Sequence, residues 1–394
     1  MHKTREIVFA TRKQVGLSLF LPRFLRLITK GGNKIKMEKK LDILIPHYHE
    51  TAKEIAPLLD SIALQQQIDL KNDVGVIICH DGDDPTSRKD YWTSYTPYEN
   101  ESPELCFCDN AELIDDDPYD ILRDYPFEIK QIRQPHKGVS AARNACLDAS
   151  TADYVMFCDA DDMFFNMCGL YVVFREMKGD GFNALTSVFI EETKDPMTGE
   201  KVYVNHEMDS TFVHGKVYRR SFLKNNGVHW NDSLTIHEDS YFNCLAQKMT
   251  AEVKYCQQPF YLWKWRDNSV CRHDPKYILK TYNNMLDSNT ALIKELLKRN
   301  KKTDAQFYIC SMIYDAYFMM NKKEWLDQEN QEYRHNTELR FKEYYSEFKS
   351  LFESIPEEQR MQLIVGMKNR FFQEGVFFES ITFDDWMKHI EALN

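Results

Sequence analysis

The stretch "YVMFCDADD" spans residues 154–162 and places a short apolar run directly before three carboxylates, Asp159, Asp161 and Asp162. The run itself is typical of a buried strand. Two unit charges 4 Å apart repel by about 1 kcal/mol in water, and by about four times as much at the effective dielectric of a protein. The acidic residues at the end of this strand therefore need compensation, either from solvent around a turn or from a bound cation.

Short apolar runs alternate with amphipathic segments on both sides of this stretch. Strands are predicted at residues 41–45, 74–79, 127–132 and 154–158, and helices at residues 54–63 and 140–150, the latter with Ser140 as its N-cap. This alternation predicts an α/β fold with a parallel, doubly wound sheet that helices cover on both faces. Ligands bind beyond the carboxyl ends of the strands in such sheets. The polar segments "PHYHE", "HDGDD" and "DADD" each follow a strand, so we expect them to gather at one edge.

The rest of the chain predicts a second region with a different pattern. A hairpin is predicted for residues 184–190 and 201–205, and further strands for residues 212–218 and 260–266. Beyond about residue 275 the apolar residues follow helical spacing. We expect a basic extension over residues 1–40, an α/β domain over 41–272 and a helical C-terminal domain over 273–394. The helical domain would contact an acceptor, a partner or a second copy of the chain.

Composition and charge exclude some classes of protein. The chain has 394 residues, of which 43% are hydrophobic and 28% charged, and this is typical of a globular protein. A formal net charge of −11 argues against a general nucleic-acid binder. The ten cysteines are scattered without a CxxC pair, which indicates reduced thiols in the cytoplasm.

The charge is distributed unevenly along the chain. Residues 1–40 hold eleven Lys or Arg and two Glu, a net charge of +9, and subtracting this from −11 leaves −20 for the remainder. One interpretation of the basic start is peripheral contact with the inner face of an anionic membrane. The other is a poorly ordered extension ahead of a natural start at Met37. Its short apolar run is broken by Pro22 and Arg23, so it does not predict a spanning helix.

The acidic motif at residues 159–162 has two interpretations when it is taken alone. Carboxylates at the end of a strand can converge on Mg²⁺ or Mn²⁺, which prefers oxygen ligands and is commonly shared with substrate phosphates. The same residues could instead form an acidic turn at the start of the next helix, whose positive end favours negative charge.

A longer stretch, "HKGVSAARNACLDASTADYVMFCDADD" (residues 136–162), resembles the family 2 glycosyltransferases, whose pattern G-V-S-x-A-R-N precedes a helix and a strand ending in D-x-D-D. The residues that match in register are Gly138, Val139, Ser140, Ala142, Arg143, Asn144, Asp159, Asp161 and Asp162. The segments "ILIPHYHE", "IICHDGDD", "FVHGKVYRRSFL", "HEDSYFN" and "RDNSVCRH" resemble further motifs of the family in the same order. The resemblance covers residues 41–273.

The resemblance implies a GT-A fold with a Rossmann-like mixed sheet, a nucleotide-sugar donor and inversion at the anomeric carbon. Asp239 matches the general base of the family, which accepts the proton of the acceptor hydroxyl. A helix N-cap is the alternative role for this residue, and Glu238 would orient the acceptor. A Mn²⁺ or Mg²⁺ ion would neutralise the leaving diphosphate. Its implied ligands are Asp161 in the leading role, Asp159 and His273.

The resemblance also implies a binding site for the nucleotide-sugar. The residues implied are Pro46, Tyr48, Glu50, Asp81, Arg143, Asp159, Ala160, Asp162, Arg266 and Arg272. Asp81 matches the uracil-binding aspartate of the family, and Tyr48 would stack on the base. Arg143 would contact the base or hold its loop, while Arg266 and Arg272 would close over the diphosphate. Packing and salt bridges are the alternative roles for such residues.

We therefore expect an inverting, metal-dependent glycosyltransferase of bacterial or phage surface-glycan type, acting in polysaccharide biosynthesis. It would use a UDP-sugar and a glycan, a teichoic-acid-like polyol phosphate or a lipid-linked acceptor, and it could form homo-oligomers through its C-terminal helices. Lys216 would reach donor or acceptor, with an ordinary strand-edge lysine as the alternative.

Two other functions remain open at this point. One is a sugar-phosphate nucleotidyltransferase, although the first predicted strand and its turn, "ILIPHYHE", lack the glycine-rich phosphate loop of that class. The other is a catalytically decayed nucleotide-sugar-binding module. The presence of Asp159, Asp161, Asp239 and Arg143 argues against this second alternative.

Overall fold

The computed structural model describes residues 39–50, 52–82, 125–179, 181–195, 197–207, 209–266, 269, 274, 276–373 and 381–393. The chain divides into two compact units, Met1–Met37 and Glu38–Asn394, and every described residue belongs to the second. The predictions for the basic extension therefore lie outside the described residues, apart from Lys39 and Lys40.

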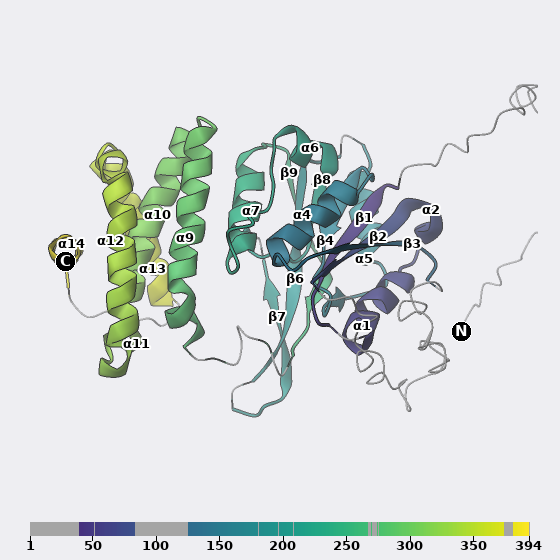
Figure 1. The fold of residues 1–394 in the computed structure, drawn as a ribbon, viewed down its shortest axis with the longest axis horizontal. Helices are drawn as coiled ribbons and strands as arrows, with labels where there is room; N and C mark the ends of the chain where they lie inside the picture. The colour runs from purple at the N-terminus through teal and green to yellow at the C-terminus, as the bar shows by residue number, and fades with distance from the viewer. Residues whose placement is uncertain are drawn as a thin grey trace, which may run out of the picture. The chain divides into compact units, whose positions relative to one another are not determined.

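The described residues form a nine-stranded mixed sheet in the order β3-β2-β1-β4-β8-β6-β9-β5, with β7 paired to β6 (Figure 1). The strands are β1 (Leu41–His47), β2 (Val74–Asp81), β3 (Glu128–Gln134), β4 (Tyr154–Phe157), β5 (Met163–Phe164), β6 (Ala184–Lys194), β7 (Lys201–His206), β8 (Lys216–Arg219) and β9 (Val253–Trp263). The neighbours β3, β2, β1 and β4 are parallel, whereas β8 is antiparallel to β4 and to β6. The predicted mixed α/β sheet is confirmed. The parallel pairing expected from the apolar runs holds for β3, β2, β1 and β4, the parallel half of the sheet.

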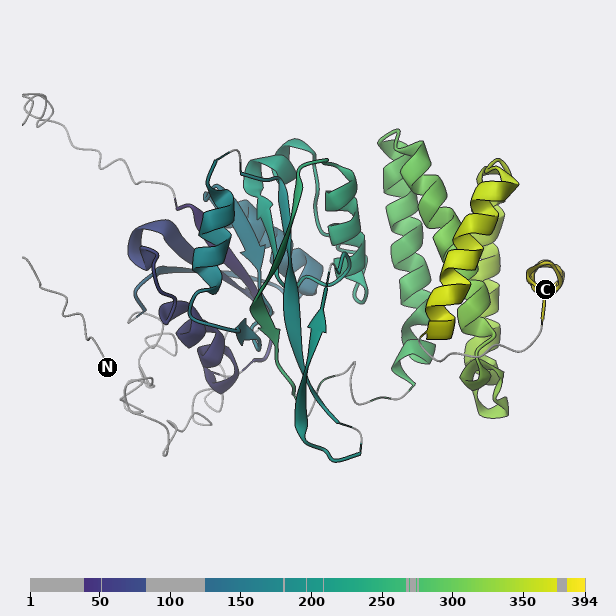
Figure 2. The same ribbon diagram turned by 180° about the vertical axis from the view of Figure 1, so that it is seen from behind.

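Helices cover both faces of the parallel half, because successive side chains of a strand point to opposite faces. Leu44 packs with residues of α4 (Val139–Ala149) on one face. Ile43 packs with residues of α1 (Ala52–Ala63) and α5 (Gly169–Met177) on the other. All residues of β1, β2 and β4 are buried, which explains why their sequences are nearly continuous apolar runs. Figure 2 shows the same layers from behind.

Two local predictions had different outcomes. The predicted hairpin is confirmed, since β6 and β7 pair antiparallel with Thr193 opposite Val202. The prediction that Ser140 caps the following helix is wrong, because α4 already begins at Val139 and its N-cap is Gly138, with φ of 91°. A positive φ is inexpensive only for glycine, so Gly138 makes the turn into the helix. The Ser140 hydroxyl instead donates to the carbonyl of Leu234 at 3.1 Å.

The C-terminal region is helical, as expected. It comprises α9 (Tyr277–Lys298), α10 (Lys302–Met320), α11 (Lys323–Leu326), α12 (Gln331–Glu353), α13 (Glu357–Gln373) and α14 (Phe383–Ala392). α9 packs against α7 (Glu238–Lys248). The Ser288 hydroxyl of α9 donates to the carbonyl of His237 at 2.7 Å, and His237 immediately precedes α7. The helical region thus contacts the start of α7, and the predicted boundary at residues 272/273 stays a prediction. Within the described ranges, no helix has the length and hydropathy needed to cross a bilayer.

Candidate active site

The polar segments that follow the parallel strands lie at one edge of the sheet. β1 pairs in parallel with both β2 and β4, so these three strands run in the same direction side by side. Glu50 follows β1, Asp81 is the last residue of β2, and Asp161 follows β4. The carboxyl group of Glu50 is close enough to feel the charge of Asp161, and burial raises the pKa of Glu50 to about 7.

Each acidic residue after β4 has its own partner. Asp159 Oδ1 accepts a hydrogen bond from Arg143 Nη2 at 2.7 Å, and Asp161 forms an ion pair with Arg266. Asp162 Oδ2 accepts from the hydroxyl of Tyr261 at 2.6 Å, and its Oδ1 accepts from a backbone amide at 3.0 Å. The three carboxyl groups that the sequence places in four positions are therefore held by three different sets of groups, of which two contain an arginine.

These surroundings separate the acidities of the three carboxyl groups. Burial opposes ionisation of Asp159, but the nearby Arg143 outweighs it and holds the pKa of Asp159 below its usual value. Burial raises the pKa of Asp161 despite the opposite charge of Arg266. Burial together with the charges of the other two carboxylates raises the pKa of Asp162 well above its usual value. The ionised form is thus most favoured at Asp159.

Asp159, Asp162 and His214 could together hold a metal ion, because one ligand atom from each lies within 4.8 Å of the others. His214 is 4% exposed, and its Nδ1 has no hydrogen-bond partner among the described residues. Burial lowers the pKa of His214 to about 3, so the imidazole is neutral, as a metal ligand must be. The His214 Nδ1 lies 3.7 Å from Asp162 Oδ2, and an imidazole nitrogen beside carboxylate oxygens fits a divalent transition ion such as Mn²⁺ better than Mg²⁺.

The predicted metal ligands are only partly brought together by this cluster. Asp159 belongs to it. Asp161, expected to lead, instead directs its carboxylate to Arg266, and its role as a ligand stays a prediction. His273 lies outside the described residues, as does Arg272.

Arg143 connects the acidic turn after β4 to the start of α7. Its side chain is 4% exposed and donates to Asp159 at 2.7 Å and to Glu238 at 2.8 Å. Its guanidinium lies over the ring of Trp230, 4.4 Å from the ring centroid. Both terminal nitrogens thus bind carboxylates of the site, so the arginine holds the start of α7 against the end of β4. Its predicted contact with a nucleotide stays a prediction.

Asp239 lies in the first turn of α7, where the sequence predicted a helix start. The N-cap of this helix is His237, in the left-handed region with φ of 61°, so Asp239 is not the cap. Asp239 Oδ1 accepts from the amide of Ser240 at 2.8 Å. Burial, and then the charge of Glu238, raise the pKa of Asp239 to about 7. A carboxyl group with this pKa can accept and release a proton near neutral pH.

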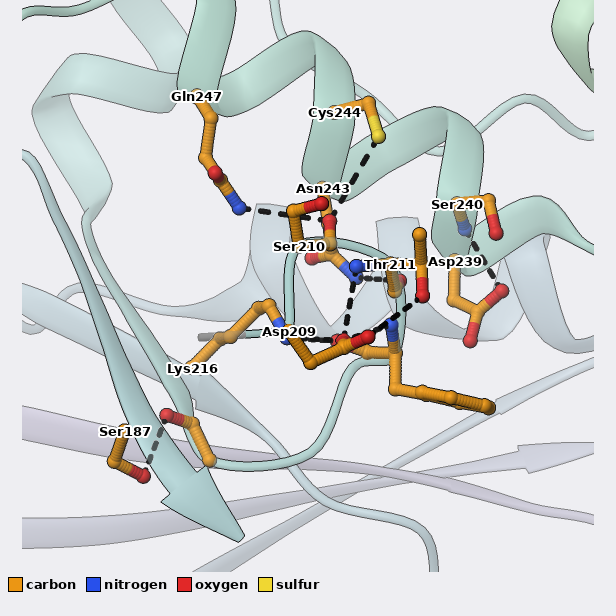
Figure 3. A network of polar contacts seen from close by, with 12 residues as sticks. Ser187, Asp209, Ser210, Thr211, Lys216, Asp239, Ser240, Asn243, Cys244 and Gln247 are labelled. Atoms are coloured by element: carbon orange, nitrogen blue, oxygen red, sulfur yellow. Dashed lines mark hydrogen bonds and ion pairs between the residues drawn. The ribbon is translucent and has the colours of Figure 1, made fainter. Parts of the chain in front are cut away.

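A buried lysine lies in the same part of the site. Lys216 is 1% exposed and belongs to β8, which lies between β4 and β6, so the strand-edge alternative is wrong. It donates to the carbonyl of Phe212 and to Asp209 at 3.3 Å. Burial lowers the pKa of Lys216, and the charges of Asp209 and Asp239 oppose this effect. Figure 3 shows this network, in which Asp209 also accepts from Thr211.

The residues predicted to bind the nucleobase lie at the ends of β1 and β2. Tyr48 is 44% exposed, and its backbone amide donates to Glu50 at 2.6 Å. Asp81 is 3% exposed and accepts hydrogen bonds from the backbone amides of the turn before α4. Pro46 is buried in β1, and Ala160 is buried in the acidic turn after β4. Neither side chain is exposed to solvent, and their predicted contacts with the nucleotide-sugar stay predictions.

Comparisons with known proteins agree with this architecture. The profile of the family "Glycosyl transferase family 2" matches residues 93–227, which include α4, the acidic turn and β8. The chain contains a family 2 glycosyl transferase domain. "Uncharacterized glycosyltransferase EpsJ" of Bacillus subtilis is 23% identical over 160 residues, covering 36% of this chain and 46% of that protein. "Succinoglycan biosynthesis protein ExoM" of Rhizobium meliloti is 49% identical over 37 residues, covering 9% of this chain and 12% of that protein. The chain thus matches less than half the length of either relative, and these matches support the predicted transferase class.

Solved structures confirm the GT-A fold of the glycosyl transferase domain. S. aureus TarS 1–349 in complex with UDP-GlcNAc has a TM-score of 0.51 and 15% identity, covering 86% of this chain and 93% of that one. The same protein in complex with UDP has a TM-score of 0.50 over 77% of this chain and 80% of that one. At this identity the likeness concerns the fold alone.

His214 and Trp230 are among the residues of the site that the sequence did not predict. His214 precedes the G-K pair of a recognised motif, but nothing local marks it as a ligand, because its neighbours Asp159 and Asp162 come from another strand end. Trp230 lies between recognised motifs, and its place under Arg143 depends on packing. A histidine directly before a recognised motif was the one available signal.

Proposed function

We propose that the chain is an inverting, divalent-metal-dependent glycosyltransferase that moves a sugar from a UDP-sugar to a hydroxyl group of a glycan, polyol-phosphate or lipid-linked acceptor. Asp239 is the general base in this proposal. The observation that carries it is geometric: Asp239 lies in the first turn of α7, whose start Arg143 joins to the acidic turn, and its pKa is raised to about 7 there. A base and a set of carboxylates for the donor are thereby held in one network.

The proposed reaction assigns each proton and bond to a group. The acceptor oxygen forms a bond to the anomeric carbon while the bond from that carbon to the diphosphate oxygen breaks. Asp239 takes the proton of the acceptor hydroxyl, and UDP leaves with the bonding electrons. Glu238, held by Arg143 at 2.8 Å, orients the acceptor beside Asp239. A bound cation would stabilise the charge that grows on the diphosphate, and Asp159, Asp162 and His214 would hold it.

The donor side of the proposal is supported by charge and by fold. Asp81 and Tyr48 would receive the base, while Arg266, beside Asp161, supplies positive charge near the diphosphate. TarS, which shares the fold, has been solved with UDP and with UDP-GlcNAc. These complexes favour a UDP-sugar as the donor. The name of ExoM, a succinoglycan biosynthesis protein, favours a polysaccharide acceptor.

The acceptor side is supported by a pocket that is lined in part by the loop before α7, the helix that carries the proposed base. Its volume is about 330 Å³. Its lining residues are Ser233, Leu234, Thr235, Ile236, Asn284, Asp287, Thr290, Ala291, Lys294, Arg340 and Tyr344. The first four belong to the loop that leads into Glu238, and the others come from α9 and α12. A polar pocket of this composition suits a hydroxyl-rich acceptor, which gives the helical region a role.

The test replaces the base and leaves the donor contacts intact. Asp239→Asn should abolish sugar transfer from UDP-[¹⁴C]sugars while UDP affinity, measured by calorimetry with Mn²⁺, stays unchanged. Asp385→Asn is the matched control, because Asp385 also lies in the first turn of a helix, α14, but outside the site. Turnover that survives Asp239→Asn would remove the base assignment. A chain that binds UDP-sugars but transfers nothing would instead be a binding module, and release of pyrophosphate from UTP with a sugar phosphate would indicate a nucleotidyltransferase.

A further inference from the structure

His136 makes two contacts in the region proposed for the nucleobase. It lies in the turn between β3 and α4, and its side chain is 57% exposed. Its Nδ1 lies 2.9 Å from Asp81 Oδ2, and since a carboxylate only accepts, the imidazole N–H is the donor. Its ring stacks on Tyr48, with the ring centroids 4.4 Å apart and the planes 21° from parallel.

The carboxylate of Asp81 has no further acceptor position to offer while these contacts last. Its Oδ1 accepts from Gln134 Nε2 and from the amide of Lys137, both at 2.8 Å. Its Oδ2 accepts from the amide of Gly138 at 2.8 Å and from His136. Two oxygens provide about four acceptor sites, so all four are used.

His136 is the more exposed of the two side chains that donate to Asp81. Two of the other donors are backbone amides of the turn before α4, and the third is the half-buried side-chain amide of Gln134. His136 packs closely against the turn after β2, because a Cβ added at Gly82 would lie 2.9 Å from His136 Cβ. Its half-exposed imidazole can still rotate about the side-chain bonds into solvent.

We propose that the imidazole of His136 occupies the place of the nucleobase in the ligand-free protein and rotates away when a UDP-sugar binds. This inference rests on the proposed function. A uracil ring is planar and carries an N–H group, so it reproduces both contacts of the imidazole: the stack on Tyr48 and the hydrogen bond to Asp81. Cytosine presents an acceptor nitrogen at the corresponding ring position and cannot donate there to the carboxylate. His136 would therefore set the affinity for the nucleobase, and Asp81 would select uracil over cytosine.

The proposal predicts a gain of affinity when His136 is removed. If the imidazole fills the site most of the time, the apparent dissociation constant is the intrinsic one divided by the fraction of open molecules. One partly exposed hydrogen bond and one ring stack hold it in place, so we expect His136→Ala to bind UDP about tenfold more tightly. His136→Phe keeps the ring and loses the N–H group, and should give a smaller gain.

The experiment is calorimetric titration of UDP and CDP, with Mn²⁺, into the full-length chain and its variants. His206→Ala is the matched control, because His206 also bonds a carboxylate, Glu191 at 2.8 Å, and stacks on an aromatic ring, Phe189 at 4.5 Å, but on the β6–β7 hairpin. We expect unchanged UDP binding in this control and weak CDP binding throughout.

Three outcomes separate the inference from the proposed function. Tighter UDP binding in His136→Ala, with UDP preferred over CDP, supports the inference. Equal or weaker UDP binding in that variant overturns the inference and leaves the proposed function standing. If neither the wild-type chain nor any folded variant binds UDP, the proposed function is wrong and the inference falls with it. A crystal structure of the UDP complex with the imidazole still bonded to Asp81 would also overturn the inference.

Discussion

Replacing Arg143 with glutamine tests whether the site depends on one buried cation. The arginine side chain is 4% exposed and binds two carboxylates, Asp159 at 2.7 Å and Glu238 at 2.8 Å. Removing one partner of a buried ion pair typically costs 3–5 kcal/mol, because the remaining charge stays desolvated. Here the side chains of Asp159 and Glu238 keep 31% and 13% exposure, which lets water relieve part of the penalty. We therefore expect a loss of about 3 kcal/mol in the free energy of unfolding.

Arg340→Gln is the matched control for this prediction. Arg340 also bridges two carboxylates, Asp287 at 2.9 Å and Glu343 at 3.1 Å, but its side chain is 41% exposed. Solvent-exposed pairs of this kind contribute about 0–1 kcal/mol. Urea unfolding followed by circular dichroism compares the two variants directly. Equal losses of stability would refute the argument that burial makes the difference.

The same variant has a kinetic consequence. The positive charge of Arg143 lowers the pKa of Asp239, opposing the burial that raises it. Without that charge the pKa of Asp239 should move above about 7, so the base would be protonated at neutral pH. We expect the pH profile of the residual transfer activity to shift to higher pH. An unchanged profile would show that the two groups are not coupled as the geometry indicates.

Three further predictions concern the proton, the metal and the turn after β2. The transfer rate should rise about tenfold between about pH 6 and about pH 8, since Asp239, with its pKa raised to about 7, must be ionised to accept a proton; an initial-rate series that stays flat contradicts this. EDTA should abolish transfer, and His214→Ala should weaken Mn²⁺-dependent UDP binding by at least about tenfold. The control His229→Ala, at an exposed position, should leave UDP binding unchanged. Equal affinities of the two variants in calorimetry would remove His214 from the metal site. Gly82→Ala should lower the free energy of unfolding by about 2–3 kcal/mol and Gly199→Ala by about 1 kcal/mol. Both glycines have positive φ, of 115° and 73°, but only a Cβ added at Gly82 would lie closer than 3 Å to another atom. Equal urea midpoints for the two variants would contradict this prediction.

Local sequence was sufficient to place the elements and the strand ends. The apolar run of β4 followed by acidic residues, and the helical patterns of α1 and α4, depend on periodicities that repeat every two or 3.6 residues and are visible in any short window. The start of α4 was not predictable in this way. Gly138, with its positive φ of 91°, makes the turn into the helix, and the N-cap is therefore Gly138 and not Ser140.

The partners inside the site were decided by the tertiary structure. Arg143 lies 16 residues from Asp159 and 95 from Glu238 in the sequence. No local pattern predicts that this arginine binds both carboxylates. His214 and His136 likewise find their partners on other strand ends.

The sequence by itself thus determined which residues stand at the rim of the sheet, since order along a strand and a turn is set by local backbone geometry. Only the packed fold decided which cation neutralises which carboxylate, and which carboxyl group remains able to take up a proton. The physical reason is that burial and charge act through space, between groups that are far apart along the chain.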